Sequence, residues 1–159
     1  MKLILLLIFL TVELFPQEEN ENVKYFLGVV GGNPINVNPT AGVYLNNYGI
    51  RLSGGVWIYD RYGIQLDLTY VFLSQQSIQH QISLISAYAH NRKYADNNFF
   101  YIIYHSGVEE GNNINSFYFG IAYNFLWKGL FIQAGPAWGT GNFEKPRLTM
   151  QIGYIHYFD

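Results

Sequence analysis

The chain contains no cysteine, few charged residues and no hydrophobic run long enough for a membrane helix. The absence of Cys from its 159 residues excludes disulfide frameworks and thiolate zinc sites. Only 13% of the residues are charged, about half of the ~25% that is typical of soluble domains. The net charge of −2 provides no basic surface for phosphates, so we expect no nucleic-acid partner. No pair of metal ligands has a suitable spacing, so we expect neither a metal site nor a cofactor.

Aromatic and hydrophobic residues are abundant instead. Half of the chain is hydrophobic and 18% is aromatic, which excludes a disordered protein. The 16 glycines in such an aromatic-rich chain favour β-structure. The length favours one folded domain.

The N-terminal segment has the features of an export signal. Lys2 supplies a positive charge, Leu3–Val12 is almost entirely apolar, and an acidic stretch follows. We therefore expect a signal peptide and short acidic leader over residues 1–22, with an open cleavage site, and one β-barrel domain over 23–159. No later stretch reaches ~18 apolar residues, so any membrane crossing would use strands.

Apolar residues alternate with small or polar ones along most of the remaining chain. The clearest segments are Gly63–Phe72 and Ser116–Trp127, where every second residue is large and apolar. Such a period places these residues on one face of a strand. The pattern predicts eight strands, at about 24–32, 38–46, 48–58, 62–73, 78–90, 115–127, 130–141 and 147–158. Two-residue turns are expected at Asn46-Asn47 and Lys128-Gly129, and a bulge is expected at Pro136 because proline lacks a ladder donor.

The distribution of charge predicts which face points outward. Among the charged residues, only Arg51 and Asp67 fall in the middle of predicted strands, and both lie on the small, polar face. A lipid-facing charge costs about 2–4 kcal/mol near the bilayer centre, so a membrane barrel keeps charges off its outer face. The inward face should be too small and polar to form a dry core. The sequence therefore predicts an all-β, antiparallel up-and-down transmembrane barrel of eight strands. A soluble lipocalin-like barrel is the alternative fold.

The C-terminal residues resemble the assembly signal of bacterial outer-membrane barrels. The residues that carry the resemblance are Gln151, Gly153, His156 and Phe158, although His156 occupies a usually hydrophobic place and Asp159 follows the terminal aromatic. The whole mature chain resembles the small eight-stranded barrels of the type of the membrane domain of outer membrane protein A. The resemblance implies insertion by the barrel-assembly machinery, a location in the cell outer membrane and both termini in the periplasm. It implies no activity.

Polar residues inside the barrel are the first candidate site. If the third and fourth strands pair across 59–61, Arg51 should lie diagonal to Asp67, within reach of its side chain. An eight-stranded barrel has just enough interior for side chains, so these residues should plug the lumen. The predicted lumen network comprises Arg51, Asp67, Gln65, Asn124, Gln133, Thr149 and Gln151.

The longest connection, 91–115, holds a second candidate site. It carries an apolar patch that could bind an extracellular partner: Phe99, Phe100, Tyr101, Ile102, Ile103 and Tyr104. We expect a monomeric, non-enzymatic outer-membrane barrel in contact with lipid, with a structural or surface-interaction role through its outer loops. A small-solute pore or ligand-binding barrel is one alternative. A lipid-modifying enzyme is another, based only on His105-Ser106 near Glu109-Glu110.

Overall fold

The structure, a computed structural model, describes residues 23–34, 36–57, 61–92 and 113–158. The expected signal peptide over 1–22 and the apolar patch Phe99–Tyr104 lie outside these ranges. No helix among the described residues is long and apolar enough to cross a membrane.

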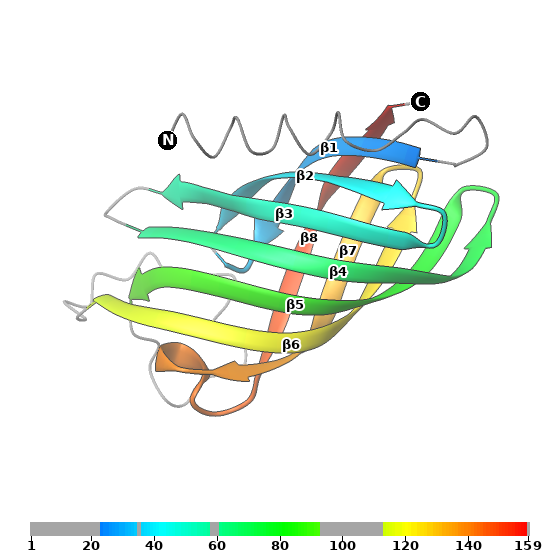
Figure 1. Cartoon of the computed structure of the whole chain (residues 1–159). Helices are drawn as coiled ribbons and strands as arrows, with labels where there is room; N and C mark the ends of the chain where they lie inside the picture. Colours follow the sequence, from blue (N-terminus) through cyan, green and yellow to red (C-terminus); the bar gives the residue numbers. More distant parts are fainter. Residues whose placement is uncertain (1–22, 35, 58–60, 93–112, 159) are drawn as a thin grey trace, which may run out of the picture.

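Eight antiparallel strands form a closed barrel (Figure 1). Each strand pairs with the next one along the chain, and the last strand pairs with the first. The predicted all-β fold, an antiparallel up-and-down barrel of eight strands, is therefore confirmed. The strands are β1 (Val23–Gly32), β2 (Val37–Leu45), β3 (Tyr48–Trp57), β4 (Arg61–Gln75), β5 (Ile78–Arg92), β6 (Asn113–Trp127), β7 (Leu130–Gly139) and β8 (Arg147–Phe158).

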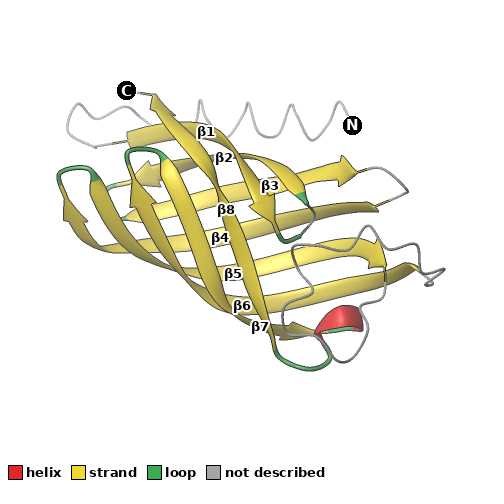
Figure 2. Ribbon diagram, turned by 180° about the vertical axis from the view of Figure 1, so that it is seen from behind, coloured by secondary structure: helices red, strands yellow, loops and turns green. Residues whose placement is uncertain are grey.

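The two ends of the barrel differ in their connections. Two-residue turns join β2 to β3, β4 to β5 and β6 to β7 at one end, here called the turn end. The longer connections lie at the opposite, loop end, where a short 3-10 helix, η1 (Gly141–Phe143), follows β7 (Figure 2). Lys128 and Gly129 both have positive φ, at 48° and 90°, as a type I′ turn requires. The turns predicted at Asn46-Asn47 and Lys128-Gly129 are confirmed, because Leu45 pairs with Tyr48 and Trp127 pairs with Leu130.

The large apolar face points outward and the polar face points inward. On β4, Ile64, Leu66 and Leu68 are between 42% and 51% exposed, whereas Gln65 and Asp67 are buried. The same alternation holds on β6, where Ile121 is exposed and Asn124 is buried. The orientation predicted from the charges is thus confirmed.

Three local predictions were wrong. The bulge lies near Phe72, where the β4–β5 register shifts, while the β6–β7 register is the same on both sides of Pro136. Pro136 faces outward and lacks a ladder donor, and the β6–β7 pairing is interrupted at residues 121–122 and 135–136 without a shift of register. β7 was predicted to end at residue 141 but ends at Gly139, because η1 begins at Gly141. β4 and β5 are longer than predicted, and the turn between them is Gln76-Ser77.

The interior is more apolar than the sequence suggested. One buried hydrophobic cluster comprises Phe26, Val30, Tyr44, Val71, Leu126, Phe131 and Ile155. A second comprises Ile85, Ala87, Tyr118, Ala122, Ala137 and Phe143. The expectation of an inner face too small and polar for a dry core was therefore wrong. Large inward side chains occur among the small ones, so the interior is filled partly by hydrophobic packing.

Candidate functional site: the polar network inside the barrel

An ion pair between β3 and β4 forms the centre of the interior polar network. Arg51 and Asp67 are directly opposite each other in the ladder, and not diagonal as predicted. The prediction assumed that residues 59–61 form the connection between the two strands. Trp57 pairs with Arg61 instead, and this register places Arg51 opposite Asp67. Arg51 donates to Asp67 Oδ2 through Nε at 2.7 Å and also through Nη2. The side chains of Arg51 and Asp67 are 3% and 0% exposed.

Neutral amides provide further hydrogen bonds to this ion pair. Asp67 also accepts from Gln65 Nε2 at 2.8 Å and from Gln133 Nε2 at 3.1 Å. Arg51 Nη2 donates to the side-chain oxygens of Gln133 and Gln151, at 3.0 and 2.8 Å. Asp67 therefore receives four hydrogen bonds in all. Hydrogen bonds to an ionised group are the stronger kind, and they offset the cost of burying the charges.

The network continues across the barrel through further inward residues. Gln133 Nε2 donates to Asn124 Oδ1 at 3.0 Å, and Asn124 Nδ2 donates to Ser83 Oγ at 2.6 Å. Gln81 Oε1 accepts from the Tyr44 hydroxyl at 2.9 Å. The connected side chains come from every strand between β2 and β8: Tyr44, Arg51, Gln65, Asp67, Gln81, Ser83, Asn124, Gln133 and Gln151. They form a polar layer across the lumen.

The structure brings six of the seven predicted lumen residues into this layer, with Thr149 as the exception. Thr149 is buried, but its hydroxyl donates to the Gly135 carbonyl at 3.0 Å. Sequence reasoning missed Tyr44, Gln81 and Ser83. Gln81 and Ser83 alternate with Ile82 and Leu84, so the rule that found Gln65 could have found them.

Aromatic packing lies beside the polar layer. The Arg51 guanidinium carbon is 4.2 Å from the centre of the Phe131 ring, an arrangement that favours a cation over an aromatic face. Phe143 of η1 folds into the loop end, where its ring stacks on Tyr118 with centres 4.0 Å apart. The Tyr118 hydroxyl lies 3.5 Å from Gln65 Oε1. Polar and apolar side chains are therefore both buried inside the barrel.

The residues of the C-terminal signal lie in the last strand. Gln151 points inward to the polar layer, and its amide nitrogen also donates to the Asn33 carbonyl. Gly153 faces β1 so closely that a side chain there would clash with the Val29 carbonyl. His156 points outward, with its ring edge-to-face against Phe158 at 4.9 Å. β8 therefore uses its inward residues for the lumen and its outward residues for the barrel surface.

Outward polar and aromatic groups gather at two heights on the barrel. Near the turn end, His80 Nδ1 lies 2.5 Å from the Tyr123 hydroxyl. Near the loop end, His90 stacks on Tyr62 with ring centres 5.0 Å apart. His90 Nδ1 lies 2.7 Å from Asn115 Oδ1. Between these heights the outward residues of β5 are Ile82, Leu84, Ser86 and Tyr88, none of them charged. Among the described residues, no three His, Cys, Asp or Glu side chains are grouped to hold a metal ion.

Comparison with known proteins gives a similarity in structure but no match in sequence. No protein-family model matches the chain, and no curated protein matches it in sequence. Among solved structures, the chain is similar to the N-terminal β-barrel domain of OprF from Pseudomonas aeruginosa. The two share 13% sequence identity with a TM-score of 0.49, over 86% of this chain and 96% of that one.

Proposed function

We propose that this chain is an integral outer-membrane β-barrel with a non-enzymatic role, structural or in surface interaction through its loop end. The observation that carries the proposal is the orientation of the wall. Large apolar side chains cover the outside, while the buried ion pair and its amides lie inside. A water-soluble barrel would place its largest apolar residues inward, so this inverted arrangement fits a hydrocarbon surrounding.

The height of the apolar surface supports the same proposal. His80 and His90 lie on the same face of β5, ten residues apart. At a rise of about 3.4 Å per residue and a tilt of about 40°, they are roughly 26 Å apart along the membrane normal. Outer-membrane barrels have an apolar band about 25 Å tall, with aromatic girdles at both interfaces. The two heights at which polar aromatic groups gather therefore fit the two membrane interfaces.

The polar layer supports a lumen that is closed to solutes over an open pore. The layer includes side chains of β3 to β8 and is joined by direct hydrogen bonds. The aromatic cluster around Phe143 and Tyr118 adds packing at the loop end. In planar bilayers, steady single-channel steps would favour the alternative, a small-solute pore.

The proposed partners follow from the surface and from the C-terminal resemblance. The apolar band would contact membrane lipid, and the pattern Gln151, Gly153 and Phe158 supports insertion by the barrel-assembly machinery. Both ends of the barrel domain lie at the turn end, since the strand number is even. An exported chain would then have both termini in the periplasm and its long connections outside. We propose a monomer as the working state.

Fractionation with a heat-modifiability assay tests the location. The mature chain should sediment with outer membranes, resist extraction by carbonate and require detergent for solubility. Without boiling it should migrate in gels as a compact band, which shifts on boiling as the barrel unfolds. Recovery in the aqueous periplasmic fraction, with the same mobility before and after boiling, would exclude the membrane barrel.

A further inference from the structure

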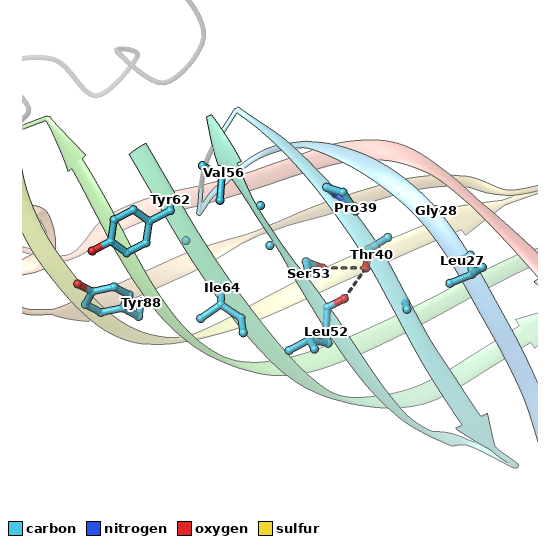
Figure 3. Close-up of a pocket in the computed structure, with 14 residues that line it drawn as sticks. Leu27, Gly28, Pro39, Thr40, Leu52, Ser53, Val56, Tyr62, Ile64 and Tyr88 are labelled. Carbon is cyan, nitrogen blue, oxygen red and sulfur yellow. Dashed lines mark hydrogen bonds between the residues drawn. The ribbon is translucent and has the colours of Figure 1, made fainter. Parts of the chain in front are cut away.

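The wall of the barrel is incomplete between β2 and β3 at the loop end. The β2–β3 ladder stops at the pair Thr40–Ser53. Beyond this pair, β2 still pairs with β1 as far as Val37, and β3 still pairs with β4 as far as Trp57. The two strands therefore separate from each other while each keeps its other neighbour. Thr40 marks the branch point, where its hydroxyl lies 2.8 Å from Ser53 Oγ and 3.2 Å from the Leu52 carbonyl (Figure 3).

A proline explains why the ladder stops there. The Leu52 carbonyl faces β2, because it accepts the Thr40 hydroxyl. Alternate residues of a strand direct their backbone groups the same way, so the Gly54 carbonyl also faces β2. Continuing the observed register would place Pro39 opposite Gly54. Pro39 has no N–H to donate, so this carbonyl lacks its ladder partner at that position.

A groove of about 690 Å³ occupies this break on the outer surface. Its outward residues include Leu27, Ala41, Leu52, Val56 and Ile64, and no charged residue lines it. Figure 3 shows Leu52, Val56 and Ile64 around the groove on β3 and β4, with Tyr62 and Tyr88 at one side. The groove is thus a hollow in the same apolar surface that the membrane proposal assigns to lipid.

Buried residues lie on the lumen side of the groove. Pro34, from the connection between β1 and β2, is fully buried beneath Gly63, a residue that lines the groove. Asn91 Nδ2 fixes Pro34 by donating to its carbonyl at 2.9 Å. Asn38, the inward neighbour of Pro39, is buried and donates to the Gly32 carbonyl at 3.1 Å. Buried residues thus lie on the lumen side of this hollow, which we call the recess.

The polar side of the recess suits the more polar part of a lipid. Tyr88 lines the groove, and its hydroxyl donates to Asn115 Oδ1 at 2.9 Å. His90 contacts the same oxygen and stacks on Tyr62, which also lines the groove. These groups lie at the loop-end height assigned above to the membrane interface. An acyl chain in the recess would thus place its ester end near hydrogen-bonding side chains.

We propose that this recess is a binding site for one acyl chain of a bilayer phospholipid. The inference rests on the membrane location proposed above, and it adds a defined lipid site to it. An uncharged, apolar hollow continuous with the lipid-facing surface selects a hydrocarbon chain over a charged partner. Small outward residues, Ala41 and Gly54, create the space that large residues fill elsewhere on the wall.

Photo-crosslinking tests the site. The mature chain is reconstituted into vesicles of phosphatidylethanolamine and phosphatidylglycerol that contain a trace of phospholipid with a diazirine in its acyl chain. After irradiation, labelled peptides are quantified by mass spectrometry. Label on Leu52 to Ile64 should exceed label on the equally lipid-facing Leu84 and Ile152 by about fivefold, the ratio given by a preference of roughly 1 kcal/mol.

Two variants and a matched control separate the site from general lipid contact. Ala41→Phe fills the recess, and Pro39→Val restores the missing donor so that the ladder can extend. Each should reduce the enrichment to the level of Leu84. Ala134→Phe makes the same change at an outward alanine of β7 and should leave the enrichment intact.

Three outcomes would overturn the proposal. Even labelling around the barrel would show only general lipid contact, with the membrane location intact. Dimers trapped in the same vesicles by a bifunctional protein cross-linker, and lost in Ala41→Phe, would show that a second copy occupies the recess. A barrel without label at any position would instead remove the membrane proposal on which the site depends.

Discussion

Removing one member of the buried ion pair is the sharpest test of the closed lumen. Asp67→Ala would leave the Arg51 guanidinium, 3% exposed, without the carboxylate that accepts two of its hydrogen bonds. It would also remove the acceptor of the Gln65 and Gln133 amides. Breaking a buried ion pair in this way costs about 3–5 kcal/mol, because an uncompensated charge remains in a low-dielectric interior. We expect the free energy of unfolding of Asp67→Ala to fall by that amount.

Asp67→Asn is not a mild replacement at this position. All four contacts of Asp67 are donors, so the amide nitrogen of an Asn would face another N–H group. We therefore expect Asp67→Asn to cost nearly as much as Asp67→Ala. The double variant Arg51→Met, Asp67→Leu removes both charges and should be more stable than either single variant, since replacing a buried pair by apolar residues is often neutral.

Urea titration of the barrel in phospholipid vesicles, followed by tryptophan fluorescence, measures these differences. Thr149→Val is a suitable control, because Thr149 is buried but donates outside the polar layer, to the Gly135 carbonyl. It should lose only the ~1 kcal/mol of one neutral hydrogen bond. A cost below about 1 kcal/mol for Asp67→Ala would mean that water reaches Arg51, and the closed-lumen argument would fail.

Four further predictions address the wall, the loop end, one turn and the lumen. Leu84 is an outward residue that is 59% exposed, and Leu84→Arg should lower the free energy of unfolding in vesicles by about 2–4 kcal/mol. Asn47→Arg, in a turn, should leave the free energy of unfolding unchanged. Equal effects of the two variants would contradict a hydrocarbon surrounding. Phe143→Ala removes the buried contact with Tyr118 and should lower the free energy of unfolding by about 3 kcal/mol in the same urea titration. An unchanged urea midpoint would show that η1 does not pack as described. Lys128→Asn should raise stability by about 0.5 kcal/mol, because Asn accepts the positive φ of this turn better than Lys; a loss of stability would argue against the type I′ geometry. The native chain should give no steady single-channel steps in planar bilayers, and regular steps would show a continuous aqueous path.

The strands were predictable because one physical rule applies along the whole chain. In an antiparallel wall with one apolar and one polar face, the period of two in residues such as Leu66 and Asp67 gives both the strand and its orientation. Hairpins with two-residue turns also fixed their registers, as at Lys128-Gly129. The register of Arg51 was wrong because the connection before Arg61 has no such constraint.

Other parts of the site depend on contacts that are distant in sequence. Phe143 belongs to a connection, where no periodicity indicates that its ring will enter the barrel and stack on Tyr118. The inward position of Phe131 follows from alternation, but its contact with Arg51 depends on how the closed barrel brings β7 over β3. The break beside Pro39 likewise depends on which neighbour its nitrogen faces, which only the register reveals.

The location of the ion pair has a consequence for how such a barrel could enter a bilayer. Its two charges lie 16 residues apart on adjacent strands, so they can neutralise each other as soon as that single hairpin forms. The other strands contribute only uncharged groups to the same layer. Neutralisation of these charges therefore does not depend on the hairpins that form later. A translocating intermediate would carry this pair of ionised groups into the hydrocarbon as one neutral unit.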